Sequence, residues 1–143
     1  MPDSLSIRYP IQIHFYDVDP MNVVWHGNYV RFMEAARTAL IAQIGYGYAE
    51  MDSSGYMWPI VDLRIKYIRP LLLQQAVVIE ATVREFEHRL VVDYVFMDEK
   101  TGQTLTKATT TQVAVKVGNT SMDMECPEDF VSRMRQYLES QSC

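Results

Sequence analysis

The sequence predicts an α+β domain in which one antiparallel sheet of about five strands curls around a single long helix. A long apolar helical pattern follows the first strand pattern, and after Pro59 the chain alternates apolar and polar residues in four successive runs. A sheet with one apolar face must bury that face, and the long helix ahead of it is suited to cover it. We therefore expect residues 1–143 to form one domain that ends in a second, amphipathic helix.

The composition is that of an ordinary globular protein. The chain has 143 residues, 48% hydrophobic and 22% charged, which is enough to bury a core without disulfides or metal. The net charge of −5 gives no footprint for nucleic acid, and Arg31, Glu34 and Arg37 interrupt the longest apolar region, so no membrane insertion is expected. Cys126 and Cys143 have no metal-ligand spacing and no signal region opens the chain, so a cytoplasmic location is expected.

The first strand and the loop after it are predicted from residues 9–25. Residues 9–15 (YPIQIHF) alternate apolar and polar side chains, the pattern of a half-buried strand. Pro20 ends this region because proline lacks a backbone donor and restricts the residue before it. A loop to about Trp25 is expected to follow.

The long helix is predicted at residues 28–44. Apolar side chains recur there at three- and four-residue spacing, and they leave only a narrow polar strip, on which Glu34 and Arg37 are spaced for an ion pair. So wide an apolar face predicts a helix that is enclosed on most sides. Gly45 supplies the expected left-handed stop, and residues 45–56 are predicted to form an irregular connection.

Strict alternation predicts four further strands, in hairpin-like succession, at residues 61–67, 77–84, 90–96 and 104–117. The last of them is rich in threonine and valine and carries its apolar residues on odd-numbered positions. Residues 128–138 have an amphipathic helical pattern whose start is marked by Pro127 and acidic residues. Covering the outer face or the edges of such a sheet calls for a second copy of the chain.

Candidate chemistry lies where the first strand joins the long helix. The stretch at 15–37 (FYDVDPMNVVWHGNYVRFMEAAR) carries the carboxylates Asp17 and Asp19, and His26 stands just ahead of the helix. A carboxylate there lies near unpaired backbone N–H groups and the positive end of the helix dipole, which suits the handling of a carbonyl group. Taken alone, Asp19 beside Pro20 is more simply explained as a turn residue.

Three motifs in this chain form a recognisable series. They are Asp17-x-Asp19-x-x-x-Val23-x-x-His26-x-x-Tyr29, then Met33-Glu34-x-Ala36-Arg37, then Pro59-Ile60-Val61-Asp62-Leu63 leading to Lys66-Tyr67-x-x-Pro70. The series resembles the hotdog-fold acyl-CoA thioesterases of the 4-hydroxybenzoyl-CoA thioesterase type, including the small thioesterases associated with the Tol-Pal cluster. The resemblance implies a curled sheet around a central helix and a homodimer or dimer of dimers with active sites at the subunit interface.

The same resemblance implies that the chain hydrolyses an acyl-CoA to a free acid and CoA, without metal or redox cofactor. Asp19 matches the catalytic aspartate, seven residues before the position whose backbone N–H polarises the thioester carbonyl, here His26. Asp19 is expected to act as nucleophile or as general base, and the sequence leaves that choice open. The His26 side chain is expected to orient water or the Asp19 carboxylate, and Asp17 to be structural or supportive.

Further expectations concern the substrate pockets and the first strand. Trp25, Met57, Trp58 and three tyrosines (Tyr46, Tyr48 and Tyr56) either belong to the core or line an acyl pocket. Phe15 stands where the nearest relatives of this type have a tyrosine, so no hydroxyl is available there. The residues expected to bind substrate are Val24, Trp25, Tyr29, Trp58, Pro59, Ile60, Val61 and Lys66.

Two alternative functions stay open at this point. The first is hydrolysis of acyl groups on an acyl carrier protein, for which an acidic chain is a poor match because the carrier is itself acidic. The second is a non-catalytic acyl-CoA-binding module, which the presence of both Asp19 and His26 disfavours.

Overall fold

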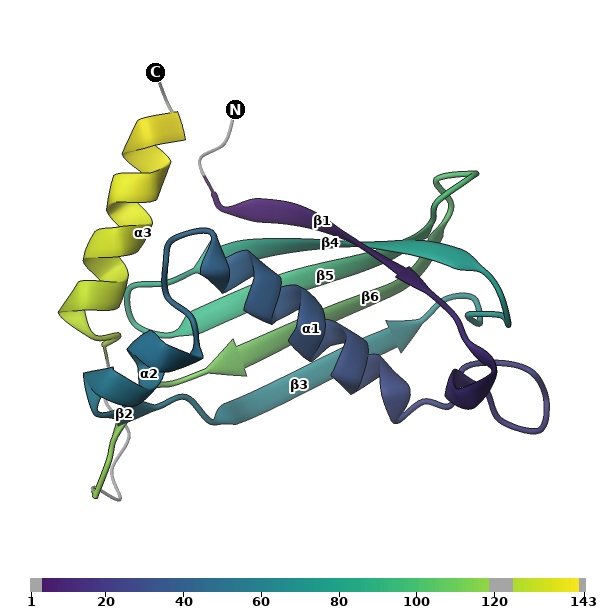
Figure 1. The fold of residues 1–143 in the computed structure, drawn as a ribbon, viewed down its shortest axis with the longest axis horizontal. Coiled ribbons are helices and arrows are strands. Elements are labelled where there is room, and N and C mark those ends of the chain that lie inside the picture. Colours follow the sequence, from purple (N-terminus) through teal and green to yellow (C-terminus); the bar gives the residue numbers. More distant parts are fainter. Residues whose placement is uncertain (1–3, 119–124, 142–143) are drawn as a thin grey trace.

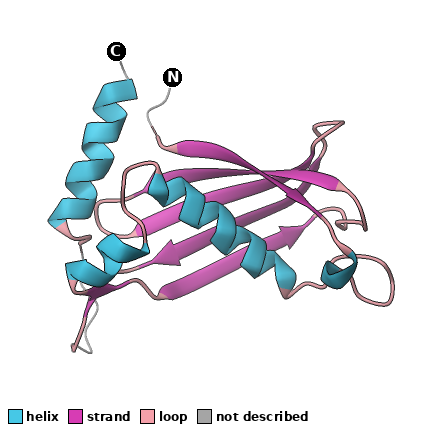
Figure 2. Cartoon of the chain, in the orientation of Figure 1, coloured by secondary structure: helices cyan, strands magenta, loops and turns pink. Residues whose placement is uncertain are grey.

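The computed structural model describes residues 4–118 and 125–141, whose path is shown in Figure 1. Figure 2 distinguishes the helices and strands by colour. In chain order the elements are β1 (Ser6–Gln12), the 3-10 helix η1 (Phe15–Asp17), α1 (Asn28–Ala42), α2 (Tyr48–Ser54), β2 (Tyr56–Met57), β3 (Ile60–Tyr67), β4 (Ala76–Glu85), β5 (Leu90–Asp98), β6 (Thr104–Gln112), β7 (Val115–Lys116) and α3 (Glu128–Gln141).

A five-stranded antiparallel sheet forms the main layer, with the spatial order β1-β4-β5-β6-β3. Helix α1 crosses one face of this sheet (Figure 1). The elements α2, β2 and α3 gather at one end of the sheet, and the loop that leads into α1 lies at the opposite end. The predicted fold class, a curled sheet around a central helix with a further helix at the carboxyl end, is confirmed.

The core lies between α1 and the central strands. The inward residues of β4 (Val77, Ile79, Ala81 and Val83) are almost fully buried, and their cross-strand neighbours on β5 include Tyr94 and Phe96. Burial of these side chains, at about 25 cal/mol per Å² of apolar surface, is the main stabilising term that anchors α1. Gly45 has φ of 74° and follows the end of α1, as predicted.

The first strand ends earlier than predicted. β1 covers Ser6–Gln12 instead of residues 9–15, and Phe15 lies in η1 with 80% of its surface exposed. The Asp17 carboxylate accepts the backbone N–H of His14, and the Asp17 N–H donates to the His14 carbonyl, so the chain turns there. Local hydrogen bonds to a side chain outcompete strand alternation at this point.

The predicted irregular connection at residues 45–56 contains the short helix α2. The Glu50 carboxylate accepts the N–H of Gly47 at 2.8 Å and so satisfies one of the free donors at the start of the helix. Gly55, with φ of 80°, ends the helix. The glycine and glutamate spacing is a capping pattern that explains why seven residues form a helix here.

The predicted strand at residues 104–117 is divided. β6 ends at Gln112, and β7 pairs instead with β2 in a separate two-stranded sheet. The irregular register between Phe96 and Met97 shifts the pairing, so the even-numbered Thr106 and Thr110 face the core. There the Thr110 hydroxyl lies 2.8 Å from the hydroxyl of Tyr94.

The hairpin-like succession is confirmed only for β4, β5 and β6. β3 does not pair with β4; it pairs with β6 and forms an edge of the sheet. The connection after β3 therefore passes along the end of the sheet that faces the start of α1, and Leu72 within it bridges to Val23.

Candidate active site

The loop between β1 and α1 folds back on itself as a small hairpin. Val18 and Val24 form an antiparallel bridge, and the backbone N–H of Asp19 donates to the carbonyl of Val23 at 2.9 Å. The N–H of Val24 donates in turn to the carbonyl of Leu71 at 2.9 Å, which attaches the hairpin to the connection after β3. The hairpin is thus held at both arms ahead of α1.

Asp19 begins the tip of this hairpin. Its carbonyl accepts the N–H of Asn22 at 2.9 Å, closing a turn in which Pro20 takes the second position and Asn22 adopts φ of 65°. Its carboxylate Oδ1 accepts the N–H of Met21 at 2.8 Å, so Asp19 does make a turn contact. Oδ2 of this half-buried residue has no hydrogen-bond partner among residues 4–118 and 125–141, so one carboxylate oxygen is available for chemistry.

Asp17 is buried, whereas Asp19 is only half-buried. Asp17 is 1% exposed; its Oδ2 accepts the N–H of His14 at 2.9 Å, and its Oδ1 accepts Nη2 of Arg31 at 2.5 Å. Its carbonyl accepts the N–H of Trp25 at 3.1 Å and Nδ2 of Asn28 at 2.8 Å. These contacts join the end of β1, the second arm of the hairpin and the first turns of α1.

The start of α1 presents unpaired backbone donors. The N–H of Asn28 donates to the carbonyl of Trp25, but the N–H groups of His26 and Gly27 have no acceptor in the part of the chain that the structure describes. They lie at the positive end of the helix dipole, where a partly negative oxygen is stabilised. The imidazole of His26 is exposed, and its ring lies 5.2 Å from the ring of Trp25.

Gly27 allows a close approach of Trp25 to this helix start. A β-carbon at position 27 would lie 2.3 Å from the Trp25 ring, so any larger residue would displace it. Trp25 is 52% exposed and forms a wall beside the backbone of residues 26 and 27. The structure therefore brings Asp19, Trp25 and His26 into one loop region.

Two of the expected substrate-binding residues are part of the core of the chain itself. Val24 is 5% and Tyr29 3% exposed, and the ring of Tyr29 packs edge-on against Tyr67 at 4.9 Å. Burial raises the pKa of the Tyr29 hydroxyl, so it stays protonated at neutral pH. Within one chain, these buried side chains support the loop.

The other expected substrate-binding residues lie toward β3. Ile60 and Val61 are 39% and 43% exposed along the free edge of the sheet, and Pro59 is exposed just before it. Lys66 is on the outer face of β3, beside a shallow hollow that Lys107 also lines. Residues 59–61 lie at the opposite end of β3 from Tyr67, which packs against Tyr29 at the start of α1, whereas Lys66 adjoins Tyr67.

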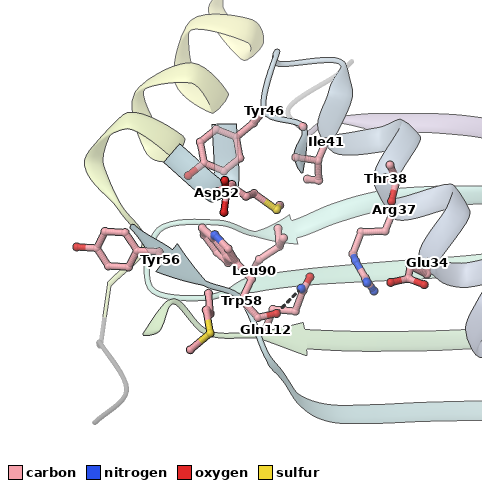
Figure 3. A pocket seen from close by; sticks show the side chains of 13 residues that line it. Glu34, Arg37, Thr38, Ile41, Tyr46, Asp52, Tyr56, Trp58, Leu90 and Gln112 are labelled. Carbon is pink, nitrogen blue, oxygen red and sulfur yellow. Dashed lines mark hydrogen bonds between the residues drawn. The ribbon is translucent and has the colours of Figure 1, made fainter. Parts of the chain in front are cut away.

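A cavity of about 370 Å³ lies beside the second half of α1 (Figure 3). Trp58 lines it at 9% exposure, and its ring lies 5.0 Å from Phe130 of α3. Tyr46 and Tyr56 line it as well, so with Trp58 they belong both to the core, or pack against it, and to a cavity wall. Met57 also lines the cavity but is 52% exposed.

The sequence did not indicate Gln112 as a cavity residue. It is 5% exposed, and its Nε2 donates to the carbonyl of Trp58 at 2.8 Å. The unbroken strand was predicted to direct its odd-numbered side chains to the core, which placed Gln112 on the outer face. The even-numbered threonines before it share its buried face and are the signal that could have indicated it.

The predicted Glu34–Arg37 ion pair is not formed. Nη1 of Arg37 instead donates to the Tyr94 hydroxyl at 3.4 Å, and both Glu34 and Arg37 line the cavity.

Cys126 is not suited to nucleophilic chemistry. Its burial raises the pKa of the thiol to about 12, so the thiolate is scarce at neutral pH. No three His, Cys, Asp or Glu side chains within residues 4–118 and 125–141 gather as a metal-binding group. None of the helices in the described ranges is long and apolar enough to span a membrane.

The fold and the loop define a class of protein: a hotdog-type α+β protein with a carboxylate and free backbone donors at the start of its central helix. Comparisons with known proteins agree. The model of the thioesterase-like superfamily matches residues 13–134. A protein of Bacillus subtilis (strain 168) named "Putative acyl-CoA thioesterase YneP" is 30% identical over 105 residues, which are 73% of this chain and 76% of that protein.

Solved structures show the same fold. The DHNA-CoA thioesterase of Staphylococcus aureus is 25% identical with a TM-score of 0.78, and the match covers 96% of this chain and 90% of that one. A variant of 4-hydroxybenzoyl-CoA thioesterase complexed with 4-hydroxybenzoyl-CoA is 21% identical with a TM-score of 0.79, covering 91% and 99%. This second likeness concerns the fold alone.

The chain belongs to the thioesterase-like superfamily. It is a thioester hydrolase of the acyl-CoA thioesterase type. The narrower resemblance to the branch associated with the Tol-Pal cluster stays a prediction.

Proposed function

We propose that this enzyme hydrolyses acyl-CoA with the Asp19 carboxylate and the His26 backbone N–H at the centre of the chemistry. One observation carries the proposal: a carboxylate with a free oxygen and an unpaired N–H at a helix start belong to the same loop. The thioester oxygen accepts the His26 N–H, and this bond strengthens as the oxygen becomes negative. One well-placed donor of this kind contributes about 3–4 kcal/mol to transition-state stabilisation.

The free oxygen of Asp19 has two possible roles. As a nucleophile it attacks the thioester carbon and expels CoA as a thiolate, and water then hydrolyses the resulting mixed anhydride. As a general base it removes a proton from a water that attacks the same carbon directly. Both routes yield a free acid and CoA, and in both the bond from Met21 to the other oxygen holds the carboxylate in place.

The edge strand β3 supports a dimer. Leu63 and Tyr67 pair with the core-facing Thr110 and Thr106, so they lie on the face of β3 that carries α1, and Val61 lies at the irregular register between Ile60 and Asp62. Val61, Leu63 and Tyr67 are 41–51% exposed. An apolar sheet edge of this kind is a template for pairing with another chain. We propose a homodimer, or a dimer of such dimers, in which two copies of β3 pair antiparallel and join the two sheets.

This pairing would complete the site. Antiparallel pairing places the end of one β3, near Tyr67, beside the start of the other, near residues 58–61. In each chain Tyr67 packs at 4.9 Å against Tyr29, in the first turn of α1. The helix start of one copy, with its Asp19, therefore approaches residues 58–61 of the second copy. This supports a substrate-binding role for Trp58, Pro59, Ile60 and Val61 that no single chain provides.

Release of free CoA thiol tests the proposed function. With short, long and aromatic acyl-CoAs, we expect kcat/KM of at least about 10⁴ M⁻¹s⁻¹ for the best substrate, the low end for natural enzymes. Rates equal to the uncatalysed background for every acyl-CoA would reject the proposed function.

The acyl-CoA substrate and the expected reducing compartment together support a cytoplasmic location.

Two outcomes of the same assay would favour other functions. A higher kcat/KM for the same acyl group on an acyl carrier protein would favour the carrier as substrate, although the net charge of −5 disfavours association with an acidic carrier. Tight product binding without turnover would indicate a non-catalytic acyl-CoA-binding module.

We expect Leu63→Lys to dissociate the dimer and to lower activity at least tenfold, because it places a charge on the apolar edge of β3. Sedimentation equilibrium should change from a multiple of 16.6 kDa to the mass of one chain. Ser6→Lys, on the opposite edge strand β1, is the matched control and should leave both mass and activity unchanged. A wild-type chain that is monomeric under assay conditions and still active would contradict the composite site.

A further inference from the structure

The connection between β3 and β4, residues 68–75, binds both ends of the loop that contains the candidate hairpin. The loop leaves the sheet at Ile13, whose N–H donates to the carbonyl of Gln75 at 3.1 Å. It returns at Val24, whose N–H donates to the carbonyl of Leu71 at 2.9 Å. The position of the hairpin on the sheet therefore depends on how firmly this connection is itself held.

The half-buried Gln75 side chain ties this connection to the end of β5. Its Oε1 accepts the N–H of Leu72 at 2.9 Å, and its Nε2 donates to Oδ2 of Asp98 at 2.8 Å. The backbone N–H of Gln75 donates to the Leu72 carbonyl at 3.1 Å. Leu72 in turn bridges to Val23 of the hairpin. One amide side chain thus links the hairpin, through Leu72, to the central part of the sheet.

Asp98 determines the orientation of the Gln75 amide. Its Oδ1 accepts the N–H groups of Lys100 and Thr101 at 2.9 and 3.0 Å, so the turn after β5 holds the carboxylate in place. An ionised carboxylate can only accept and the Leu72 N–H can only donate, so a primary amide is suited to join them, with its NH₂ toward Asp98. The bond from Gln75 lowers the pKa of Asp98, which therefore stays ionised at neutral pH.

The backbone of the connection needs such support because one of its residues is strained. Gln74 has φ of 67°, a left-handed conformation that residues other than glycine seldom adopt. Its N–H donates to the carbonyl of Ile13 at 2.9 Å. A strained residue keeps its conformation only where the surrounding structure fixes it, and the adjacent Gln75 side chain supplies two of the bonds that do so.

The contacts of the connection fall between the two groups of the proposed chemistry. Val23 and Val24 lie between Asp19 and His26 in the chain, and the Asp19 N–H donates to the Val23 carbonyl at 2.9 Å. A shift of the connection would therefore change the position of the Asp19 carboxylate relative to the His26 N–H. Misplacement of reacting groups by about 1 Å can lower a rate about 10²-fold.

We propose, resting on the proposed function, that Gln75, oriented by Asp98, is a positioning residue that sets the Asp19 carboxylate against the His26 N–H. Neither Gln75 nor Asp98 touches the substrate. Both act through Leu72 and the hairpin, so their loss affects the chemical step and not the binding of acyl-CoA.

Complementary substitutions test this inference. Gln75→Glu places two carboxylates face to face, and Asp98→Asn leaves a donor of Gln75 or of the turn after β5 without its acceptor. The double variant Gln75→Glu/Asp98→Asn restores every bond with one donor reversed. The new amide at position 98 donates to the new carboxylate at position 75, which still accepts the Leu72 N–H, and the net charge is that of the wild type.

We expect each single variant to lower kcat for the best acyl-CoA at least about tenfold, with KM within about threefold of the wild-type value. The double variant should recover kcat to within about threefold of the wild type, because its hydrogen bonds are complementary again. Initial rates of thiol release give both constants. In ¹⁵N–¹H correlation spectra, the amide signals of Val24 and His26 should shift in the single variants and return in the double variant.

Gln136→Glu is the matched control for the added charge. It makes the same change at an exposed position of α3, at the other end of the sheet, and should leave kcat unchanged. Circular dichroism checks that each variant is folded at the assay temperature. The two single variants are independent, so either one, with the double variant, decides the question if the other is unstable.

Wild-type kcat in both single variants would overturn the inference, as would losses that the double variant does not recover. A fall in affinity with unchanged kcat would also overturn it, because the pair would then act on binding. Amide shifts that appear in the single variants and return in the double variant, in a protein without acyl-CoA hydrolysis, would retain the positioning of the hairpin and reject the proposed function. Hydrolysis by the wild type and unchanged single variants would do the reverse.

Discussion

Replacing Asp19 with asparagine is expected to lower kcat/KM by at least about 10³-fold. A loss of this size is typical when a positioned general base is removed, and the removal of a nucleophile can cost more. The amide oxygen of asparagine can still accept the Met21 N–H, now at 2.8 Å, so the hairpin should keep its shape. The amide can neither attack a thioester nor take a proton from water. Initial rates of thiol release measure the loss, and thermal unfolding checks the fold.

Two variants define what the Asp19 result means. Asp129→Asn neutralises an exposed carboxylate on α3 that pairs with Arg133, and it should leave kcat/KM unchanged. His26→Ala keeps the backbone N–H, so its kcat/KM should stay within about tenfold of the wild-type value. Near-normal hydrolysis by Asp19→Asn across the acyl-CoA panel would remove Asp19 from the chemistry. A loss in His26→Ala as large as that in Asp19→Asn would bring the imidazole into it.

Replacing Asp17 with alanine is expected to lower the free energy of unfolding by about 3 kcal/mol. The change leaves the His14 N–H without its acceptor and removes the partner of Arg31 at a site that is 1% exposed. Loss of one partner in a buried hydrogen-bonded network belongs to the strongly destabilising class of substitutions. Urea unfolding followed by circular dichroism measures the difference.

Asp62→Ala is the matched control for the Asp17 prediction. It removes a carboxylate that is 45% exposed and pairs with Arg64, whose side chain is 80% exposed, so the lost ion pair is largely solvated and the cost should stay below about 1 kcal/mol. Asp17→Ala with wild-type stability but no catalysis would contradict the structural role of Asp17. The two neighbouring carboxylates would then have exchanged their roles.

The parts of the fold that the sequence predicts well are those in which one periodic signal dominates. The alternation at β4 and β5 and the apolar pattern of α1 reflect a shared core, so side-chain period and packing agree there. Where single side chains bind the backbone, the pattern misleads. The Asp17 carboxylate ends β1 before Phe15, and the Glu50 carboxylate starts a helix in a stretch predicted to be irregular.

The candidate site was predictable only in its local part. Asp19 and the His26 N–H are seven residues apart, and a motif can encode such a pair. The cavity instead joins Glu34 to Gln112, so its composition depends on the pairing of β3 with β6 and on the parity of a divided strand. Neither of these follows from local periodicity, because strand order is set by the packing of the whole sheet.

The placement of the hairpin and the cavity at opposite ends of α1 bears on how such an enzyme can diversify. The helix has 15 residues, about 22 Å of rigid backbone at 1.5 Å per residue, and substitutions around Tyr46 or Gln112 need not move the hairpin. After gene duplication, one copy could accumulate changes in the walls of this cavity while the hairpin kept its shape. The length of a single helix would thus let the two ends of the domain evolve separately.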